Sequence, residues 1–171
     1  MRIHIGTDHA GLDFTRHLRD HLEAAGHDVV DHGPREFDPL DDYPSFCINA
    51  AVGVIDDQAA GVETLGVVFG GSGNGEQIAA NKVRGIRAAL IWNDSTALLA
   101  RQHNDANVCA IGARQHTLEE AMHLIDLFIA EPFSKEERHA RRIAQLAEYE
   151  ATGSIDGRIV DHPDAAGTAP A

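Results

Sequence analysis

A glycine-rich segment that ends in a glutamate carries the clearest chemistry in the sequence. It runs from Phe69 to Glu76 as Phe-Gly-Gly-Ser-Gly-Asn-Gly-Glu, after an apolar run and before a helical pattern. Glycines let the backbone approach a ligand closely, and successive N–H groups at a helix start favour an anion. With Glu76 as base, such a loop suits removal of a proton beside a carbonyl while the N–H groups stabilise the enediolate. A plain turn with a first-turn glutamate favoured by the helix dipole is the alternative.

Three known motifs do not fit this loop. Gly71-x-Gly73 puts Glu76 where the dinucleotide fingerprint G-x-G-x-x-G needs its third glycine, and no Gly-Lys-Ser/Thr follows as in a P-loop. Asn74 stands where a G-x-S-x-G nucleophile elbow needs its closing glycine. A hydride-transferring dehydrogenase is therefore disfavoured, and an anion-holding loop with a carboxylate at its helical end remains.

Two further segments place histidines where they could do chemistry. Asp8 and His9 end the first apolar run, and they lie at the same sheet edge as the glycine loop if the first and third strands are neighbours. His103 lies in a polar stretch before the last strand and could act as a general acid or base, because histidine titrates near neutral pH. A helix N-cap for Asp8 and a helix-dipole partner for His103 are the alternatives.

The position of His103 raises a geometric problem. It precedes the strand expected at Asn107–Gly112 and therefore belongs at the amino end of the sheet, opposite Glu76. A five-residue strand is about 17 Å long, too far for the two groups to act on one substrate within one subunit. If both act together, His103 comes from a second chain, and we expect a homodimer, or a higher oligomer, with a shared site.

The charge distribution limits the partners. A net charge of -13 and a pI near 5.1 argue against nucleic acid and anionic membranes, which need a basic surface. An anionic ligand therefore needs a local cluster of cations. Arg114 follows the last strand, and Arg138 and Arg142 lie one helical turn apart, as suits phosphate binding by guanidinium groups. A surface helix with salt bridges to its own glutamates is the alternative.

Short β-branched apolar runs alternate with longer amphipathic segments, which is typical of βαβ units. We expect an α/β fold, a three-layer α/β/α Rossmann-like domain with a five-stranded parallel sheet, whose ligands bind at the carboxyl ends of the strands. The expected strands are Arg2–Gly6, Asp28–His32, Leu65–Gly70, Ile86–Trp92 and Asn107–Gly112. The expected helices are Ala10–Ala25, Pro44–Asp57, Glu76–Lys82, Asp94–Gln102, Leu118–Ala130 and Lys135–Ala151, the last after a capping box from Ser134 to Glu137.

The remaining sequence suggests one cytoplasmic domain without metal. Residues 1–151 form the expected domain, and residues 152–171, rich in Gly, Pro and Ala, form an expected mobile tail. Two isolated cysteines, Cys47 and Cys109, are expected to be reduced, and we find neither a signal-peptide pattern nor a stretch of about 20 apolar residues. His17 and His21 are one turn apart but lack the glutamate of H-E-x-x-H, so a solvated face is expected there.

Five spaced segments together resemble the ribose-5-phosphate isomerase B family, in order from residue 1 to about residue 150. They are Gly6-Thr-Asp-His-Ala-Gly11, Asp42-Tyr-Pro44, Gly70-Gly-Ser-Gly-Asn-Gly-Glu-Gln-Ile-Ala-Ala-Asn-Lys82, Arg101-Gln-His-Asn-Asp105 and Ile111-Gly-Ala-Arg114. The position of the glutamate after the glycine loop resembles the pattern of the actinobacterial branch of this family. Other members carry a Cys base before the loop, where this chain has Phe69 or Gly70.

The resemblance implies interconversion of ribose 5-phosphate and ribulose 5-phosphate through an enediolate, without a metal or organic cofactor, at a site shared by two subunits. It implies that Glu76 is the base, that His103 assists ring opening and that Ser72 adds a hydroxyl near the reacting end. The implied binding residues are Asp8, Asn104 and Tyr43 for the sugar, Gly71, Gly73, Asn74 and Gly75 for the anion hole, and His9, Arg114, Arg138 and Arg142 for the phosphate.

Two alternatives stay open. The first is an isomerase of another phosphorylated aldose, such as allose or galactose 6-phosphate, because pocket depth sets the sugar length. The second is a non-catalytic sugar-phosphate-binding module, which would need the glycine loop and the arginines but neither Glu76 nor His103.

Overall fold

Five parallel strands form the centre of the first of two compact units into which the chain divides after Ser134. The computed structural model describes residues 1–156. The strands lie in the order β2-β1-β3-β5-β4, which makes β1 and β3 neighbours. Their bounds are Arg2–Gly6 (β1), Asp28–Asp31 (β2), Thr64–Gly70 (β3), Ala88–Leu90 (β4) and Val108–Gly112 (β5). The predicted α/β fold with a five-stranded parallel sheet is thus confirmed.

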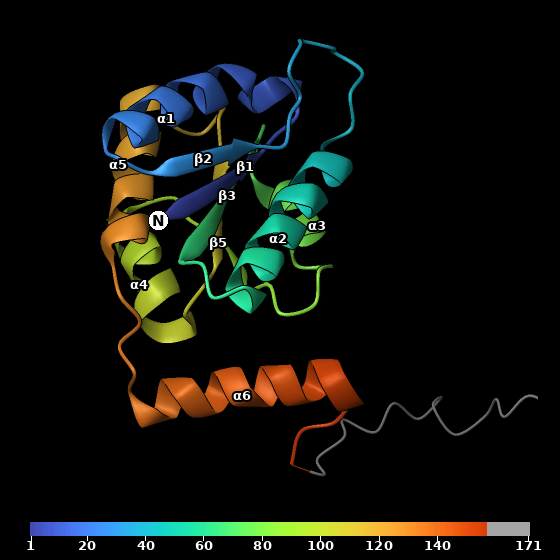
Figure 1. Cartoon of the computed structure of the whole chain (residues 1–171), viewed down its shortest axis with the longest axis vertical. Helices are drawn as coiled ribbons and strands as arrows, with labels where there is room; N and C mark the ends of the chain where they lie inside the picture. The colour runs from blue at the N-terminus through green and yellow to red at the C-terminus, as the bar shows by residue number, and fades with distance from the viewer. Residues whose placement is uncertain (157–171) are drawn as a thin grey trace, which may run out of the picture. The chain divides into compact units, whose positions relative to one another are not determined.

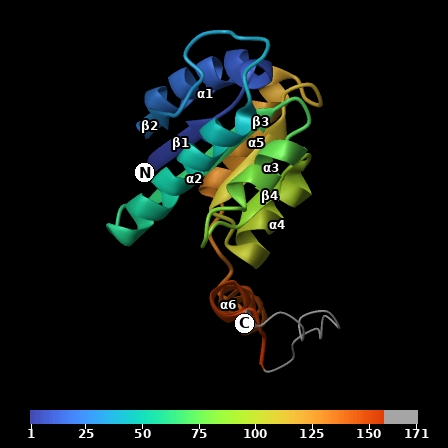
Figure 2. The same ribbon diagram turned by 90° about the vertical axis from the view of Figure 1, so that its right-hand side faces the viewer.

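Helices cover both faces of this sheet, as Figures 1 and 2 show. One face packs against α1, α4 and α5, and the other against α2 and α3. The bounds are Leu12–Ala24 (α1), Tyr43–Ala59 (α2), Asn74–Ala80 (α3), Asp94–Asn104 (α4) and Leu118–Ala130 (α5), with a short 3-10 helix, η1, at His9–Gly11. None of the helices described is long and apolar enough to cross a membrane.

The central strands explain why the sequence contains continuous apolar runs. Val67 and Phe69 of β3 face the helices α1, α4 and α5, whereas Val68 between them faces α2 and α3. All three side chains are fully buried. A strand in a parallel sheet with helices on both faces is expected to be almost continuously apolar, and β3 meets this condition except at Thr64, its first residue. The carboxyl end of β3 is therefore held rigidly where the glycine loop begins.

The edge strand β4 is shorter than expected, and side chains bind its backbone at both ends. The Asn81 side chain accepts from the Ala88 N–H at 2.8 Å and donates to the Ala88 carbonyl at 2.9 Å. Beyond the strand, the Trp92 N–H donates to the Thr96 hydroxyl at 2.9 Å. The predicted strand Ile86–Trp92 is therefore correct in position and too long at each end.

The second unit contains one described helix, α6, which spans Glu137–Thr152. The predicted start at Lys135 with a capping box is wrong, because Lys135 adopts the left-handed conformation at φ 57° and cannot enter a helix. Glu136 takes the N-cap position without a side-chain cap, and Gly153 ends the helix at φ 75°. Of the predicted tail, residues 157–171 lie outside the described residues.

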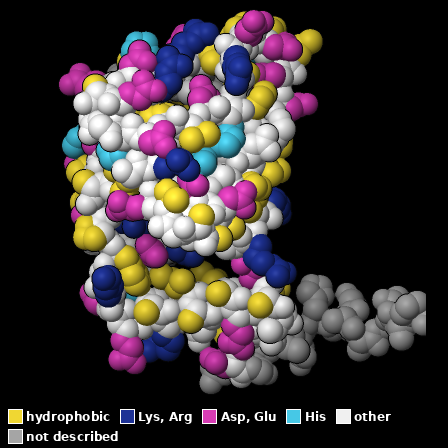
Figure 3. Space-filling view, in the orientation of Figure 1, with side chains coloured by type: hydrophobic (Ala, Val, Ile, Leu, Met, Phe, Trp, Pro, Cys, Tyr) yellow, Lys and Arg dark blue, Asp and Glu magenta, His cyan; other side chains and the backbone are white. Residues whose placement is uncertain are grey.

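Charged side chains of both signs share the surface of the first unit. On the face drawn in Figure 3, Lys and Arg are interspersed with Asp, Glu and several His. Cations mixed with acidic groups in this way do not make a basic face, which agrees with the net charge of -13. A phosphate ligand must therefore be held by particular residues and not by a general positive field.

Candidate active site

The loop between β3 and α3 is a backbone turn that only glycine permits. Strand β3 ends at Gly70 and α3 begins at Asn74, with Gly73 as its N-cap in the left-handed conformation at φ 79°. A Cβ on Gly73 would lie 2.7 Å from a methyl group of Leu90 and 2.9 Å from the backbone of Ile111. The loop is thus pressed against the ends of the neighbouring strands, which fixes the direction of its N–H groups.

Two more glycines make room for side chains of the site. A Cβ on Gly70 would overlap the carboxylate of Glu76, which therefore lies directly on the end of β3. A Cβ on Gly75 would lie 2.6 Å from the hydroxyl oxygen of Tyr43, so the tyrosine ring covers the start of α3. The structure thus brings Tyr43, Gly75 and Glu76 together beside the loop.

Glu76 is buried, with 4% of its surface exposed, although it carries an ionisable carboxyl group. Burial raises the pKa of Glu76, and the negative charge of Asp8 raises it further, while hydrogen bonds from the N–H groups of Glu76 and Gly73 oppose the shift. A carboxylate with a raised pKa in a cleft is a better base near neutral pH than an exposed one.

Asp8 and His9 follow β1 and form the start of η1. The Asp8 carboxylate accepts from the Ala10 N–H at 2.9 Å and caps this short helix. The His9 ring nitrogen Nδ1 lies 2.7 Å from Asp41 Oδ1, and the same oxygen accepts from the His9 N–H at 3.0 Å. Asp41 lies in the segment between β2 and α2, which has no periodic pattern, so nothing in the sequence indicated this contact.

Asp8, His9 and Asp41 also form a cluster that could hold a metal ion, since their ligand atoms lie within 4.8 Å of one another. The helix cap made by Asp8 and the contact between His9 and Asp41 already account for this closeness. The cluster does not need an ion to explain its geometry. It lies at the carboxyl end of β1, beside the loop that carries Glu76.

Arg114, Ser72 and Asn74 are exposed side chains around the same loop. The Arg114 N–H donates to the Gly71 carbonyl at 3.2 Å, and a Cβ on Gly71 would lie 3.3 Å from the Arg114 guanidinium. The Asn74 side chain donates to the Ser72 hydroxyl at 3.3 Å, as does the Asn74 backbone N–H. The loop therefore presents a cation on one side and a hydroxyl with an amide on the other.

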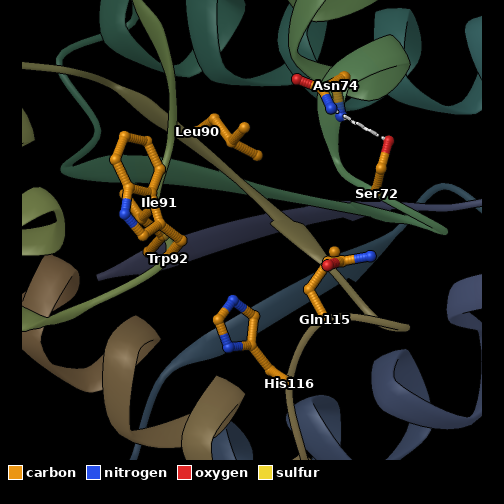
Figure 4. Close-up of a pocket in the computed structure, with 8 residues that line it drawn as sticks. Ser72, Asn74, Leu90, Ile91, Trp92, Gln115 and His116 are labelled. Carbon is orange, nitrogen blue, oxygen red and sulfur yellow. Dashed lines mark hydrogen bonds between the residues drawn. The ribbon is translucent and has the colours of Figure 1, made fainter.

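A cavity of about 480 Å³ opens beside Ser72 and Asn74, at the carboxyl ends of β4 and β5. In Figure 4, Leu90, Ile91 and Trp92 come from the end of β4, while Gln115 and His116 come from the segment after β5. Sequence reasoning missed Trp92, Gln115 and His116, because they belong to no motif and meet only through the sheet. The cavity extends the space beside the loop with a mixed apolar and polar lining.

His103 and Asn104 lie at the other end of the sheet. They are the last two residues of α4, which leads into the amino end of β5, whereas Glu76 follows the carboxyl end of the parallel neighbour β3. The segment is firmly supported, because Arg87 Nε donates to the Asn104 carbonyl at 2.9 Å and Arg101 donates to the Ala106 carbonyl at 2.6 Å. The structure therefore does not bring His103 to Glu76 within this chain.

Arg138 and Arg142 belong to α6 in the second unit, where both are exposed and one helical turn apart. The Arg138 Nε lies 2.8 Å from Glu136 Oε2, with both side chains more than half exposed. This ion pair matches the alternative interpretation of a salt-bridged surface helix, and an exposed pair of this kind contributes little to stability.

Comparison with known proteins adds the decisive observation to this geometry. Residues 3–146 match the model of the family described as Ribose/Galactose Isomerase. The chain belongs to the ribose/galactose isomerase family. A curated relative, ribose-5-phosphate isomerase B of Mycobacterium tuberculosis, is 51% identical over 152 residues, which are 89% of this chain and 91% of the relative.

Solved structures of family members have the same fold. Ribose-5-phosphate isomerase B of Clostridium thermocellum superposes with a TM-score of 0.82 at 38% identity, over 90% of this chain and all of that one. The Mycoplasma genitalium enzyme, solved with bound ribulose-5-phosphate, gives a TM-score of 0.82 at 38% identity, over 88% of this chain and 97% of that one. The family thus includes a member that holds a ketose phosphate on this fold.

Proposed function

We propose that this chain interconverts ribose 5-phosphate and ribulose 5-phosphate by proton transfer, with Glu76 as the base. The single observation that carries the proposal is the buried Glu76 carboxylate, whose pKa is raised, at the end of a loop of backbone N–H groups. Membership of the family and the named relatives support the same substrate pair. A binding module would have no use for a buried carboxylate in this place.

In the proposed reaction, Glu76 takes the proton from C2 of the open-chain aldose. The electrons move toward O1 and form an enediolate, which the N–H groups from Gly71 to Gly75 stabilise. Glu76 then returns a proton to C1, while the proton of the O2 hydroxyl passes to O1 beside Ser72, and the ketose forms. Asp8 and Tyr43 hold the sugar, Asn74 belongs to the anion hole, and the reaction needs neither a metal nor an organic cofactor.

The phosphate would be held by His9, Arg114, Arg138 and Arg142, as the family resemblance implies. Arg114 is supported by its place beside Gly71, and His9 by its place beside Asp8 at the same end of the sheet. Planar guanidinium groups suit a dianionic phosphate, because they donate two parallel hydrogen bonds. The assignment of the two α6 arginines rests on the resemblance and on their exposure.

His103 and Asn104 would act in the site of a partner subunit, as ring-opening acid or base and as sugar ligand. The support is their place at the opposite end of the sheet from Glu76.

A mixing experiment tests whether two subunits of a homodimer share the site. Glu76→Gln and His103→Asn homodimers, each inactive, should regain about a quarter of wild-type activity after joint refolding, because half of the random dimers are hybrids with one intact site. Absence of any recovery would place both groups in one chain or outside the reaction.

Incubation with ribose 5-phosphate in deuterated water tests the reaction itself. We expect ribulose 5-phosphate that carries solvent label at C1, because a proton held by a carboxylate can exchange before it is returned. Ketose that stays free of label over many turnovers would indicate an intramolecular hydride shift and contradict the role of Glu76. Absence of ketose from any pentose or hexose phosphate would leave the sugar-phosphate-binding module.

A second candidate substrate is a phosphorylated hexose such as galactose or allose 6-phosphate. The observation that favours it is the cavity of about 480 Å³ next to Ser72 and Asn74, which offers room beyond a pentose. The same assay with these sugars decides the preference through the ratio of their kcat/KM values.

A further inference from the structure

The contact between His9 and Asp41 has a geometry that a surface ion pair does not need. One carboxylate oxygen, Asp41 Oδ1, accepts twice from the same residue, from the ring Nδ1 at 2.7 Å and from the backbone N–H at 3.0 Å. This double contact fixes both the backbone and the ring of His9. A single flexible salt bridge would leave the ring free to turn.

Asp41 is itself held in a buried place. Its side chain is only 10% exposed, and its second oxygen, Oδ2, is buried without a hydrogen-bond partner among the described residues. Burying a carboxylate with one oxygen unpaired costs stability. The Phe37 ring meets the His9 ring edge-on at 5.8 Å between centroids, which restrains the imidazole from another side.

The direction of these bonds decides which nitrogen of His9 faces the site. An ionised carboxylate can only accept hydrogen bonds, so Nδ1 must carry the hydrogen in the contact with Asp41. The other ring nitrogen, Nε2, has no hydrogen bond among the described residues and is left for a ligand. His9 lies three residues after the end of β1, at the end of the sheet where Glu76 lies.

We propose that Asp41 is a positioning residue that fixes the ring and the tautomer of His9, so that Nε2 alone is presented to the phosphate of the substrate. The inference rests on the proposed function, because it assumes that His9 meets a sugar phosphate. It adds Asp41, from the segment between β2 and α2, to the proposed site.

The tautomer is tested without any reference to catalysis. Long-range ¹H–¹⁵N correlation spectra at pH 8 distinguish a ring protonated at Nδ1 from one protonated at Nε2, and His9→Gln identifies the His9 signals among the 11 histidines. We expect the Nδ1–H form in the wild type and a mixture of both forms in Asp41→Asn, since an amide can donate as well as accept. A wild-type ring protonated at Nε2 overturns the proposal.

Kinetics test the positioning role. Asp41→Asn should raise KM for ribose 5-phosphate about five- to fiftyfold and change kcat less than about threefold, as expected when binding and not chemistry is impaired. Added to His9→Gln, it should have almost no further effect, because both changes remove the same contact. The matched control is Asp38→Asn, an aspartate of the same segment whose carboxylate accepts from the Leu40 N–H, and we expect it to change neither constant.

The outcomes separate this inference from the proposed function. If the wild type does not isomerise any sugar phosphate, the proposed function fails, and titration with inorganic phosphate then decides the inference. Phosphate should still move the His9 signals, and more weakly in Asp41→Asn. Effects of Asp41→Asn and His9→Gln that simply add, or a loss confined to kcat, would show that Asp41 acts on something other than His9.

Discussion

Three of the described helices carry a glutamate in the first turn, and the glutamates at the starts of α3 and α5 have opposite environments. At the start of α5, Glu120 is exposed and forms a capping box with Thr117, whose N–H and hydroxyl donate to Glu120 Oε2 at 2.8 and 3.0 Å. These hydrogen bonds lower the pKa of Glu120. At the start of α3, Glu76 is buried without a side-chain cap, and burial together with Asp8 raises its pKa.

The difference in environment indicates different roles for the two carboxylates. Both occupy a position that the helix dipole favours, so helix position alone does not distinguish them. Glu120 gains hydrogen bonds in its charged form and thereby stabilises the fold. Glu76 is kept in a place that disfavours its charged form, which costs stability and suits the base proposed for the reaction. The comparison therefore separates a structural glutamate from the proposed catalytic one by environment, and the following substitutions test it.

The largest effect is expected from Glu76→Gln. The amide keeps the shape of the side chain but cannot accept a proton, so kcat should fall by at least about a hundredfold while KM stays within about threefold. Glu120→Gln, the matched substitution at the other helix start, should leave both constants unchanged. Steady-state assays with ribose 5-phosphate decide the matter, and near-normal turnover of Glu76→Gln would remove the proposed base.

A smaller loss is expected when the carboxylate is displaced instead of removed. A Cβ on Gly70 would overlap the Glu76 carboxylate, so Gly70→Ala should lower kcat by about ten- to a hundredfold, because a displacement of about 1 Å is enough for such a loss. Gly71→Ala should have a milder effect, since its Cβ would meet only the flexible end of Arg114. Equal losses of kcat in both variants would mean that the reaction is sensitive to any added methyl group in the loop and not to the position of the Glu76 carboxylate.

Much of this arrangement was predictable from the sequence, because it depends on residues that are close together in the chain. The glycines from Gly70 to Gly75 and the apolar run of β3 are contiguous, so their roles as turn, cradle and buried strand could be inferred from residue types alone. The order of the elements then placed His103 at the opposite end of the sheet. Periodicity and parallel topology are enough for such statements, because they depend on neighbours in sequence and on strand direction.

The features that the sequence did not reveal depend on contacts between distant segments. The approach of Asp41 to His9 joins residues 32 positions apart across a segment with no regular pattern. The start of α6 was misplaced because the left-handed backbone of Lys135 carries no signature in its residue type. The environment that distinguishes Glu76 from Glu120 is likewise set by burial and by Asp8, and neither can be read from the first turn of a helix.

The pH dependence of the reaction sharpens the comparison further. Glu76 must be ionised to act as a base, so kcat/KM should fall as the pH drops through its raised pKa, above the usual range of a glutamate. Asp8→Asn removes a negative charge that raises this pKa, so the acid limb should move to lower pH, and lost substrate contacts should lower the plateau about tenfold. Asp13→Asn, on the exposed side of α1, is the control that should leave the limb in place. If the acid limb of Asp8→Asn did not move, the charge of Asp8 would not influence the pKa of Glu76.

The smallest effects are expected on stability, and they should have opposite signs at the two helix starts. The pKa of Glu76 is higher in the folded than in the unfolded chain, so its contribution to stability is present at low pH and is lost as the pH rises through the folded pKa. Glu76→Gln should therefore raise the Tm by a few degrees at pH 8, and this gain should vanish at low pH. The pKa of Glu120 is lowered, so its contribution is present near neutral pH and is lost as the pH falls through the folded pKa. Glu120→Gln should accordingly lower the Tm at pH 8 and leave it unchanged at low pH. Thermal unfolding of both variants from low pH to pH 8 measures these shifts. Shifts of the same sign in the two variants at pH 8 would contradict the comparison.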